Sequence, residues 1–358
     1  MAEQTGDFEW SGEGEGAEVV LYAPDDSALE RILPAARLPG VESPVYAAAS
    51  PRTREFGWVA ASSSHAAPDL ISAPAWGMLF AAGVAVENLG PPGEIPRLIS
   101  RNLSELRLPT LNEAGVRRTC ESGALAAAED GLIEEEDLAF LDQREGDPDS
   151  LGRRAISAGM RDWERLGEFH VYRVGEILDS EKAESLGLEE GALALVVLAG
   201  AGDLGRLAVS GHRDRIQARV LGGDFGAEEG LPAAPLDTEE AADLLAATSA
   251  AANFAAGRAA LLLYALRRAV GDFAGELRPL LSWTLGGFEE RDGLLLHRQN
   301  LVSAGEGESL VSGSSVVEAA GGMLGSAPPF EAPEQDGGWP WEEAGLLERM
   351  GELYSLNR

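Results

Sequence analysis

Lysine is almost absent from this chain: Lys182 is the only one in 358 residues, and arginine supplies the other basic side chains. A Walker A phosphate loop requires the sequence Gly-Lys-Ser/Thr, so a P-loop nucleotidase is excluded. Any covalent intermediate on a lysine would depend on Lys182 alone. Because Lys182 lies in an acidic segment that is typical of an exposed helix, lysine-based catalysis is disfavoured.

Cysteine and histidine are also scarce. The single cysteine, Cys120, permits neither an internal disulfide nor a cysteine-rich metal cluster. The four histidines are His65, His170, His212 and His297, and none stands in a His-x-x-x-His or His-x-Glu spacing. We expect His170 within a strand and His212 on a polar turn. Local motifs therefore supply no metal site.

Targeting and membrane-spanning segments are not evident. Residues 1–7 have neither the basic nor the apolar region of a signal peptide. The longest nearly apolar run, residues 73–86, is too short to cross a bilayer. We therefore expect a cytoplasmic protein that has no membrane partner.

The charge balance is strongly acidic, with a formal net charge of −32 and a pI near 4.4. Such a field repels phosphate backbones, so general nucleic-acid binding and a DNA partner are not expected. An acidic surface of this kind favours solubility in a high-salt, halophilic cytoplasm. The content of 45% apolar and 25% charged residues is that of a folded globular protein.

Residue patterning predicts alternating helices and strands. Short apolar runs predict strands over residues 19–22, 55–61, 77–86, 169–177 and 193–199. Helical periodicity predicts helices over residues 25–37, 95–106, 113–129 and 341–353, and another that begins at residues 134–137. A long alanine-rich helix should begin after Asp237-Thr238 and end at Gly271, and Asp292-Gly293 should turn a hairpin.

The domain organisation that we predict is one α/β domain over residues 1–358 with mixed sheets. Residues 1–17 form an acidic, glycine-rich leader, and residues 327–340 form a Pro/Gly-rich segment. No internal repeat and no domain boundary is apparent in the sequence.

One motif suggests a dinucleotide site. The sequence from Gly200 to Gly205 matches G-x-G-x-x-G directly after an apolar strand, and Asp224 follows at the distance of a ribose-binding acid. The motif should open a helix, but Ser210-Gly211 is expected to break one there. Flanking βαβ alternation is missing as well. An NAD(P)-binding enzyme that uses Gly200–Gly205 is therefore kept as a second alternative.

A different motif order carries a family resemblance. A small-residue helix over 250–258, with Asn253, precedes a hairpin that closes in His297-Arg298-Gln299. This order resembles the nucleotide-pocket half of the RtcB-type RNA ligases, which join RNA 2′,3′-cyclic-phosphate or 3′-phosphate ends to 5′-hydroxyl ends. Residues 71–83 resemble the family loop S-P-x-x-V-G-x-D-I-x-C-G, residues 165–169 resemble L-G-x-G-N-H-F, residues 197–205 resemble I-H-T-G-S-R-G-L-G, and residues 325–329 resemble S-A-x-H-G-A-G-R. The resemblance extends from about Ser72 to Leu353 and implies an RtcB-like fold.

The resemblance implies Mn²⁺ and GTP as cofactors, but this chain departs from the pattern wherever a donor is needed. The positions of the metal donors and of the guanylate-accepting histidine hold Leu79, Ala82, Glu168 or Gly167, Leu198, the segment Ser282-Trp283-Thr284, and Pro329. Apolar side chains cannot ligate Mn²⁺, and a proline cannot be a nucleophile. We therefore expect no catalytic residue, no bound metal and no cofactor.

A remnant of the nucleotide pocket is still expected. His297, Arg298 and Gln299 resemble the start of the family segment H-R-K-G, and Gly313-Ser314 resembles the phosphate-side loop P-G-[ST]-M-G. Together with Asn253 these residues form a candidate vestigial ligand site. The alternative is a hairpin end at which His297 and Arg298 merely face solvent.

The sequence thus predicts a catalytically degenerate RtcB-like protein that binds an RNA end, an anion or a protein partner, such as an active ligase paralogue. The first alternative is an active GTP- and Mn-dependent RNA ligase of RNA repair or tRNA splicing with a reorganised site. Whether the chain is an enzyme is left open.

Overall fold

The computed structural model describes residues 7–10, 16–22, 29–49, 56–75, 77–85, 94–141, 144–165, 168–174, 184, 189, 192–225, 231–271, 277–284, 286–304, 307–310 and 350–356. Everything below concerns these residues. Gly313, Ser314 and Pro329 lie outside them, as does the Pro/Gly-rich segment 327–340.

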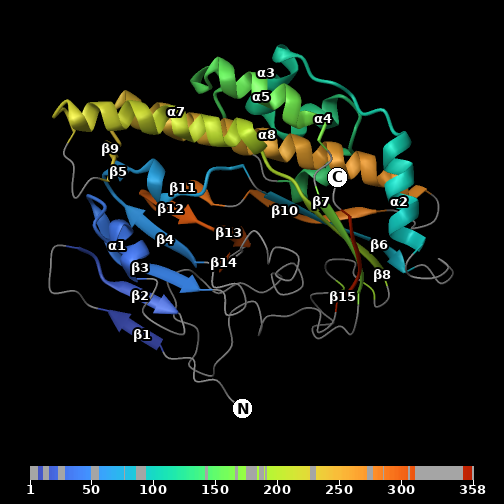
Figure 1. The fold of residues 1–358 in the computed structure, drawn as a ribbon, viewed down its shortest axis with the longest axis horizontal. Coiled ribbons are helices and arrows are strands. Elements are labelled where there is room, and N and C mark those ends of the chain that lie inside the picture. Colours follow the sequence, from blue (N-terminus) through green and yellow to red (C-terminus); the bar gives the residue numbers. More distant parts are fainter. Residues whose placement is uncertain are drawn as a thin grey trace.

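A six-stranded sheet occupies one side of the molecule (Figure 1). Its strand order is β1 (Asp7–Trp10), β2 (Val19–Tyr22), β3 (Val41–Ala49), β4 (Phe56–Ser62), β12 (Leu294–Gln299) and β11 (Gly287–Arg291). Strands β2 and β3 are parallel, and the other pairs are antiparallel. Helix α1 (Leu29–Ala36) packs Ile32 and Ala35 against this sheet. Strand β1 corrects the expectation that residues 1–17 are only a leader.

A five-stranded, fully antiparallel sheet lies beside it. Its order is β10 (Arg278–Thr284), β6 (Gly77–Ala85), β8 (Ala192–Leu198), β7 (Glu168–Val174) and β15 (Met350–Leu356). Strand β15 contradicts the helix predicted over residues 341–353, because its first residues pair with β7; residues 341–349 are outside the described chain. Two short pairs, β5 (His65–Ala66) with β9 (Ala234–Pro235) and β13 (Leu301–Ala304) with β14 (Gly307–Leu310), complete the pairing.

Helices cover one face of both sheets (Figure 1). Helices α7 (Gly202–Leu221) and α8 (Glu239–Val270) form the first layer, and α3 (Glu113–Ser122), α4 (Ala124–Glu129) and α5 (Arg153–Trp163) lie beyond them. Helix α2 (Glu94–Glu105) packs on α8, and three 3-10 helices contact the larger elements: η2 (Pro68–Leu70) meets α7, η3 (Glu135–Phe140) meets β10, and η4 (Pro148–Ser150) meets α8. Mixed helices and antiparallel sheets confirm the predicted α/β class, whereas the single domain over 1–358 stays a prediction.

The core helix α8 begins and ends where its sequence signals predict. The hydroxyl of Thr238 accepts a hydrogen bond from the N–H of Ala241, and Gly271 ends the helix with φ of 53°. Small residues let neighbouring backbones approach: a Cβ on Gly257 would lie 2.2 Å from Cγ2 of Thr119. By length and composition α8 is the one helix among the described residues that could cross a membrane, but 89% of its apolar 18-residue stretch is buried inside the protein.

Other boundaries differ from the sequence expectations. The helix predicted over residues 113–129 divides at Gly123, whose φ is 58°, into α3 and α4. The acidic run at 134–137 opens a 3-10 helix rather than an α-helix, and Asp137 within it is buried and binds Arg267. The hairpin turn is confirmed, since Asp292 and Gly293 have φ of 53° and 80°.

Candidate functional site

His297 is buried completely in strand β12, where the sheet meets the turn before η2. Its Nε2 accepts a hydrogen bond from the N–H of Ala67 at 3.0 Å, and its Nδ1 lies 3.2 Å from the carbonyl oxygen of Leu295. These contacts fit the neutral tautomer that carries its hydrogen on Nδ1. Burial lowers the pKa of His297 to about 4. The interpretation that it faces solvent is wrong, and both ring nitrogens have partners within the fold.

Arg298 is also buried rather than exposed, with 2% of its surface accessible. Its Nη2 lies 2.8 Å from Oε2 of Glu289 on the neighbouring strand β11. Its carbonyl oxygen accepts a hydrogen bond from the N–H of Ser72 at 3.1 Å. Arg298 therefore pairs with a partly exposed carboxylate, and its backbone carbonyl links the loop before β6 to the six-stranded sheet.

Asn253 is fully buried at the middle of α8 and binds only backbone groups. Its Oδ1 accepts from the N–H of Arg144 at 2.8 Å, and its Nδ2 donates to the carbonyl oxygens of Cys120, Glu121 and Arg144 at 3.1, 3.0 and 2.6 Å. The side-chain amide thus joins α3 and the segment at Arg144 to α8. A side chain engaged in this way is a structural residue in the described fold.

These predicted site residues nevertheless meet in one region. Nη1 of Arg144, held by Asn253, donates to the carbonyl oxygen of Phe288 at 3.1 Å. Phe288 lies opposite His297 in the β11–β12 ladder, and their rings meet edge to face at 5.0 Å. Gln299 ends β12 opposite Trp58 of β4. Arg144 and Phe288 therefore link Asn253 to His297, while a ligand site formed by these residues stays a prediction.

The positions that the family gives to metal donors lie toward one end of the five-stranded sheet. Leu198 pairs with Met78 on one side and with Glu168 on the other, while Leu79 pairs with Val197 and Ser282. Ala82 lies three residues further along β6, opposite Ala194. These segments are neighbours in one sheet, but Leu79 is one residue out of phase with Leu198, and Ala82 is displaced along the strand.

The side chains described at these positions do not fit a metal ion. Leu79 is fully buried in the core between the sheet and α8, together with Leu195, Val197, Ala260 and Leu263. Ala82 is buried too, and neither residue has a donor atom. Across the described ranges, no group of three or more His, Cys, Asp and Glu residues could hold a metal. Cys120 is buried, and burial raises the pKa of its thiol to about 12.

The glycine motif at residues 200–205 does open a helix, contrary to expectation. Helix α7 runs without interruption through Ser210-Gly211 to Leu221. His212 is therefore not on a polar turn; it is buried in α7, and its Nε2 lies 3.1 Å from the carbonyl oxygen of Ser150. Glycine has a low helix propensity, so Gly211 destabilises α7 slightly. A side chain at this position would contact no other atom, because nothing lies within 4 Å of its Cβ position.

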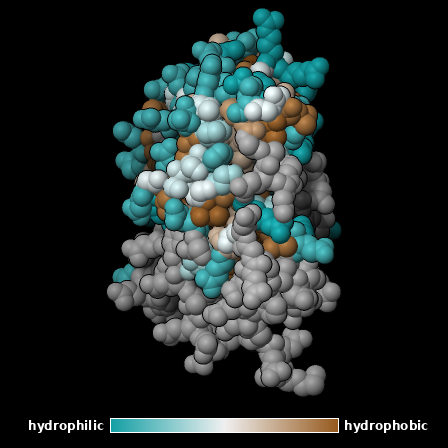
Figure 2. Space-filling model, turned by 90° about the vertical axis from the view of Figure 1, so that its left-hand side faces the viewer, coloured by the Kyte–Doolittle hydropathy of each residue, from teal (hydrophilic) through white to brown (hydrophobic). Residues whose placement is uncertain are grey.

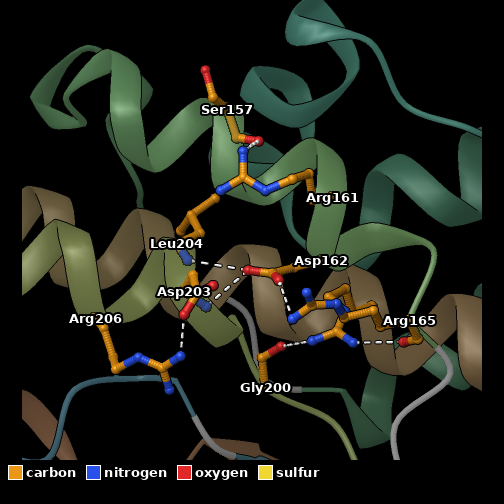
Figure 3. A network of polar contacts seen from close by, with 9 residues as sticks. Ser157, Arg161, Asp162, Arg165, Gly200, Asp203, Leu204 and Arg206 are labelled. Carbon is orange, nitrogen blue, oxygen red and sulfur yellow. Dashed lines mark hydrogen bonds and ion pairs between the residues drawn. The ribbon is translucent and has the colours of Figure 1, made fainter. Parts of the chain in front are cut away.

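The N-terminus of α7 is capped by the side chain of Asp162 (Figure 3). Oδ2 of Asp162, from α5, accepts hydrogen bonds from the N–H groups of Asp203 and Leu204 at 2.8 and 3.3 Å. Strand β8 is antiparallel to both of its neighbours, so the parallel βαβ unit of a dinucleotide site does not exist here. Asp224, the proposed ribose acid, pairs with Arg219. The geometry thus speaks against the NAD(P) alternative.

Asp162 and Arg258 were missed by the sequence argument. Arg258, on α8, is buried and donates through Nη1 to the carbonyl oxygen of Gly200 and through Nη2 to that of Arg165 at 2.7 Å. Burial lowers the pKa of Arg258 to about 10, so the side chain is still charged near neutral pH. Asp162 shares a helical stripe with Ala155, Ala158 and Gly159, which is the signal that could have placed it inside.

Comparison with known proteins agrees with the order of the segments. The family model described as tRNA-splicing ligase RtcB matches residues 92–285, which is more than half of the chain. The tRNA-splicing ligase RtcB of Pyrococcus furiosus is 29% identical over 207 residues, an alignment that covers 51% of this chain and 21% of that protein. The chain therefore spans about a fifth of the length of this relative. On the strength of the family match, the chain belongs to the RtcB family.

Proposed function

We propose that this RNA ligase-like protein has lost ligase chemistry and keeps a binding role. The observation that carries the proposal is Leu79, which fills the core against α8 where the family resemblance places an aspartate for the metal. A charged donor set could not replace this packing without leaving unpaired charge in an apolar core. Ala82 adds no donor on the same strand.

The nucleotide side of the site supports the same proposal. Guanylate transfer needs a nucleophilic imidazole, and the resemblance puts Pro329 in that place. His297 does not substitute for it, because its Nε2 accepts from Ala67 and its Nδ1 lies beside the carbonyl of Leu295. Neither GTP nor Mn²⁺ is expected to be a cofactor.

A protein partner fits the surface better than an RNA end does. Several partly exposed arginines form ion pairs with the protein's own carboxylates: Arg117 with Glu113 and Asp149, Arg118 with Asp130, Arg213 with Asp69, Arg215 with Asp243, and Arg219 with Asp224 and Glu240. In the coloured part of the face shown in Figure 2, hydrophilic residues surround several hydrophobic patches. With a net charge of −32, few cations are left for phosphates.

The ligase test uses the full chain with a 3′-phosphate RNA, a 5′-hydroxyl RNA, radiolabelled GTP and Mn²⁺. We expect neither a labelled protein band nor a joined RNA, while an active RtcB ligase in the same buffer gives both. A joined product would establish the alternative of an active ligase with a reorganised site. Elemental analysis after dialysis should find no stoichiometric Mn or Zn, and one tightly held metal per chain would contradict the proposal.

The binding role is tested by mixing the chain with an active RtcB-family ligase and measuring the mass of the eluted species by light scattering. A complex of defined stoichiometry supports the protein-partner role. A salt-sensitive change in the anisotropy of a 3′-phosphate RNA, without a ligase complex, would favour RNA-end binding instead. Cytoplasmic location is part of the proposal and can be checked by fractionation.

A further inference from the structure

Helix α7 carries apolar residues on two opposite faces. Its inward face packs against α5, α8 and η2, and it buries Leu204, Ile216 and Val220. Its outward face holds two large hydrophobic side chains, of which Leu207 is 36% and Leu221 is 79% exposed. The outward face of a surface helix is normally polar, because only the inward face is removed from water. These two leucines are therefore available to a partner outside this chain.

The two leucines mark the ends of one line along the helix. Positions 207, 211, 214, 218 and 221 follow the alternating spacing of four and three residues that keeps side chains on one side of an α-helix. All five residues are exposed, and we call them the outer α7 stripe: Leu207, Gly211, Asp214, Ala218 and Leu221. Between its two leucines the stripe has small residues, so a second helix laid along it would contact both leucines and approach closely between them.

Gly211 weakens α7 without serving a contact inside the described fold. Glycine in a helix interior costs about 1 kcal/mol relative to alanine. Nothing lies within 4 Å of the Cβ position of Gly211, so no neighbouring element of this chain uses the space that the missing side chain leaves. A helix of another molecule would use this space, because glycine admits the closest approach to a backbone.

Asp214 puts one negative charge at the centre of the stripe. Its neighbours three and four residues away on the helix are not basic: Ser210, Gly211, Gln217 and Ala218. The arginines of α7 bind other carboxylates: Arg206 with Asp203, Arg213 with Asp69, Arg215 with Asp243, and Arg219 with Asp224 and Glu240. Within the described part of the chain Asp214 forms no ion pair. The stripe thus presents a free carboxylate between two apolar ends.

This charge pattern favours a different protein over a second copy of the chain. A symmetric antiparallel pair of α7 helices would place Asp214 beside Asp214 of the second copy, because position 214 is the midpoint of the stripe. Each copy also carries a net charge of −32, so long-range repulsion opposes their association. An amphipathic helix with an arginine or lysine at the centre of its apolar face would instead pair with Asp214 and cover both leucines.

We propose that the outer α7 stripe is the docking surface for one amphipathic helix of the protein partner. Apolar side chains of that helix pack on Leu207 and Leu221, its backbone approaches Gly211, and a basic side chain pairs with Asp214. The inference rests on the proposed function, because it takes an active RtcB-family ligase as the source of the helix.

The test measures the Kd of the full chain for an active RtcB-family ligase by titration calorimetry. Leu221→Ala and Asp214→Arg should each raise the Kd about tenfold or more, since one removes an apolar anchor and the other opposes a basic side chain. Gly211→Gln should also weaken binding, although it removes a residue of low helix propensity. Leu125→Ala and Glu129→Arg make the matched changes at exposed positions of α4 and should bind like wild type. All variants should keep the circular dichroism of the wild type, because every changed residue is exposed.

Weaker binding of the α7 variants with unchanged α4 controls supports the docking surface. If wild type binds the ligase and all variants bind equally well, the stripe is not the docking surface, while the protein-partner role stands. If wild type forms no complex with the ligase, both the partner role and this inference are overturned. A wild-type dimer in light scattering that L221A dissociates would assign the stripe to a second copy and would also overturn the inference.

Discussion

The backbone N–H of Ala67 donates a hydrogen bond to Nε2 of His297 at 3.0 Å, across 230 residues of sequence. The acceptor nitrogen must be unprotonated, so this link between the turn before η2 and strand β12 requires a neutral imidazole. The ring is fully buried and packs edge to face on Phe288, which leaves no water to stabilise a charged form. A residue that the family resemblance assigns to a ligand pocket is here part of the core.

This link predicts a pH dependence of stability. The pKa of His297 is lowered from 6.5 to about 4 in the folded protein, so below about pH 6.5 the unfolded chain binds a proton that the folded chain does not. The contribution of neutral His297 to the free energy of unfolding is complete above about pH 6.5. It is lost as the pH falls toward 4, and the loss is roughly 3 kcal/mol at most.

Urea unfolding of wild type and His297→Gln at pH 7 and pH 4.5 measures this contribution. The free energy of unfolding should fall more steeply with acid in the wild type than in the variant. Burial also lowers the pKa of His212, and many carboxylates titrate, so the difference between the two proteins isolates His297. Parallel losses in both proteins would contradict the assignment.

A second prediction concerns Cys120. Burial raises its pKa to about 12, so almost no thiolate exists at pH 8 and reagents cannot reach the sulfur. We expect a thiol-specific disulfide reagent to leave the native protein unlabelled and to label it fully in urea. Labelling of native protein at a rate near that of a free thiol would show that Cys120 is accessible and available as a ligand.

Local signals predicted much of the fold. Thr238 and Gly271 bound α8, and Asp292-Gly293 turns the hairpin, because caps and turns depend on a few adjacent residues. The path of α7 through Gly211 was not predictable locally, since packing of α7 on α5 and α8 outweighs the propensity cost of one exposed glycine. Strand β15 forms by pairing with a segment far away in sequence, and the local helical pattern carries no information about that partner.

The environment of the candidate site residues could not be predicted from the sequence. Among the described residues, Asn253 is linked to His297 only through Arg144 and Phe288, and membership of the site stays a prediction. Their burial depends on Arg144, Phe288 and Glu289, which reach them from other strands and loops. A sequence motif gives the residue type at each position. The contacts that make such a residue structural come from residues distant in sequence, so only the folded protein shows them.

A third prediction tests whether position 79 is a core position. Leu79→Ala should lower the free energy of unfolding by about 2–5 kcal/mol, because it leaves a cavity against α8. Leu79→Asp, which restores the family's residue type, should destabilise more and should not create Mn²⁺ affinity. Leu125→Ala is the control, since Leu125 is 40% exposed and should change stability by less than about 0.5 kcal/mol. Tight Mn²⁺ binding by a folded L79D protein would be the contrary result.

The last prediction contrasts two glycines of α7. Gly202 has φ of +57°, and its Cβ would meet the carboxylate of Asp162, so Gly202→Ala should destabilise the protein by about 1–3 kcal/mol. Gly211 is exposed in the middle of the helix with nothing within 4 Å of its Cβ position, so Gly211→Ala should stabilise by about 0.5–1 kcal/mol. Chemical denaturation of both variants measures the pair. The opposite signs are the decisive feature: equal small effects would mean that the close approach of Asp162 to the start of α7 does not exist in solution.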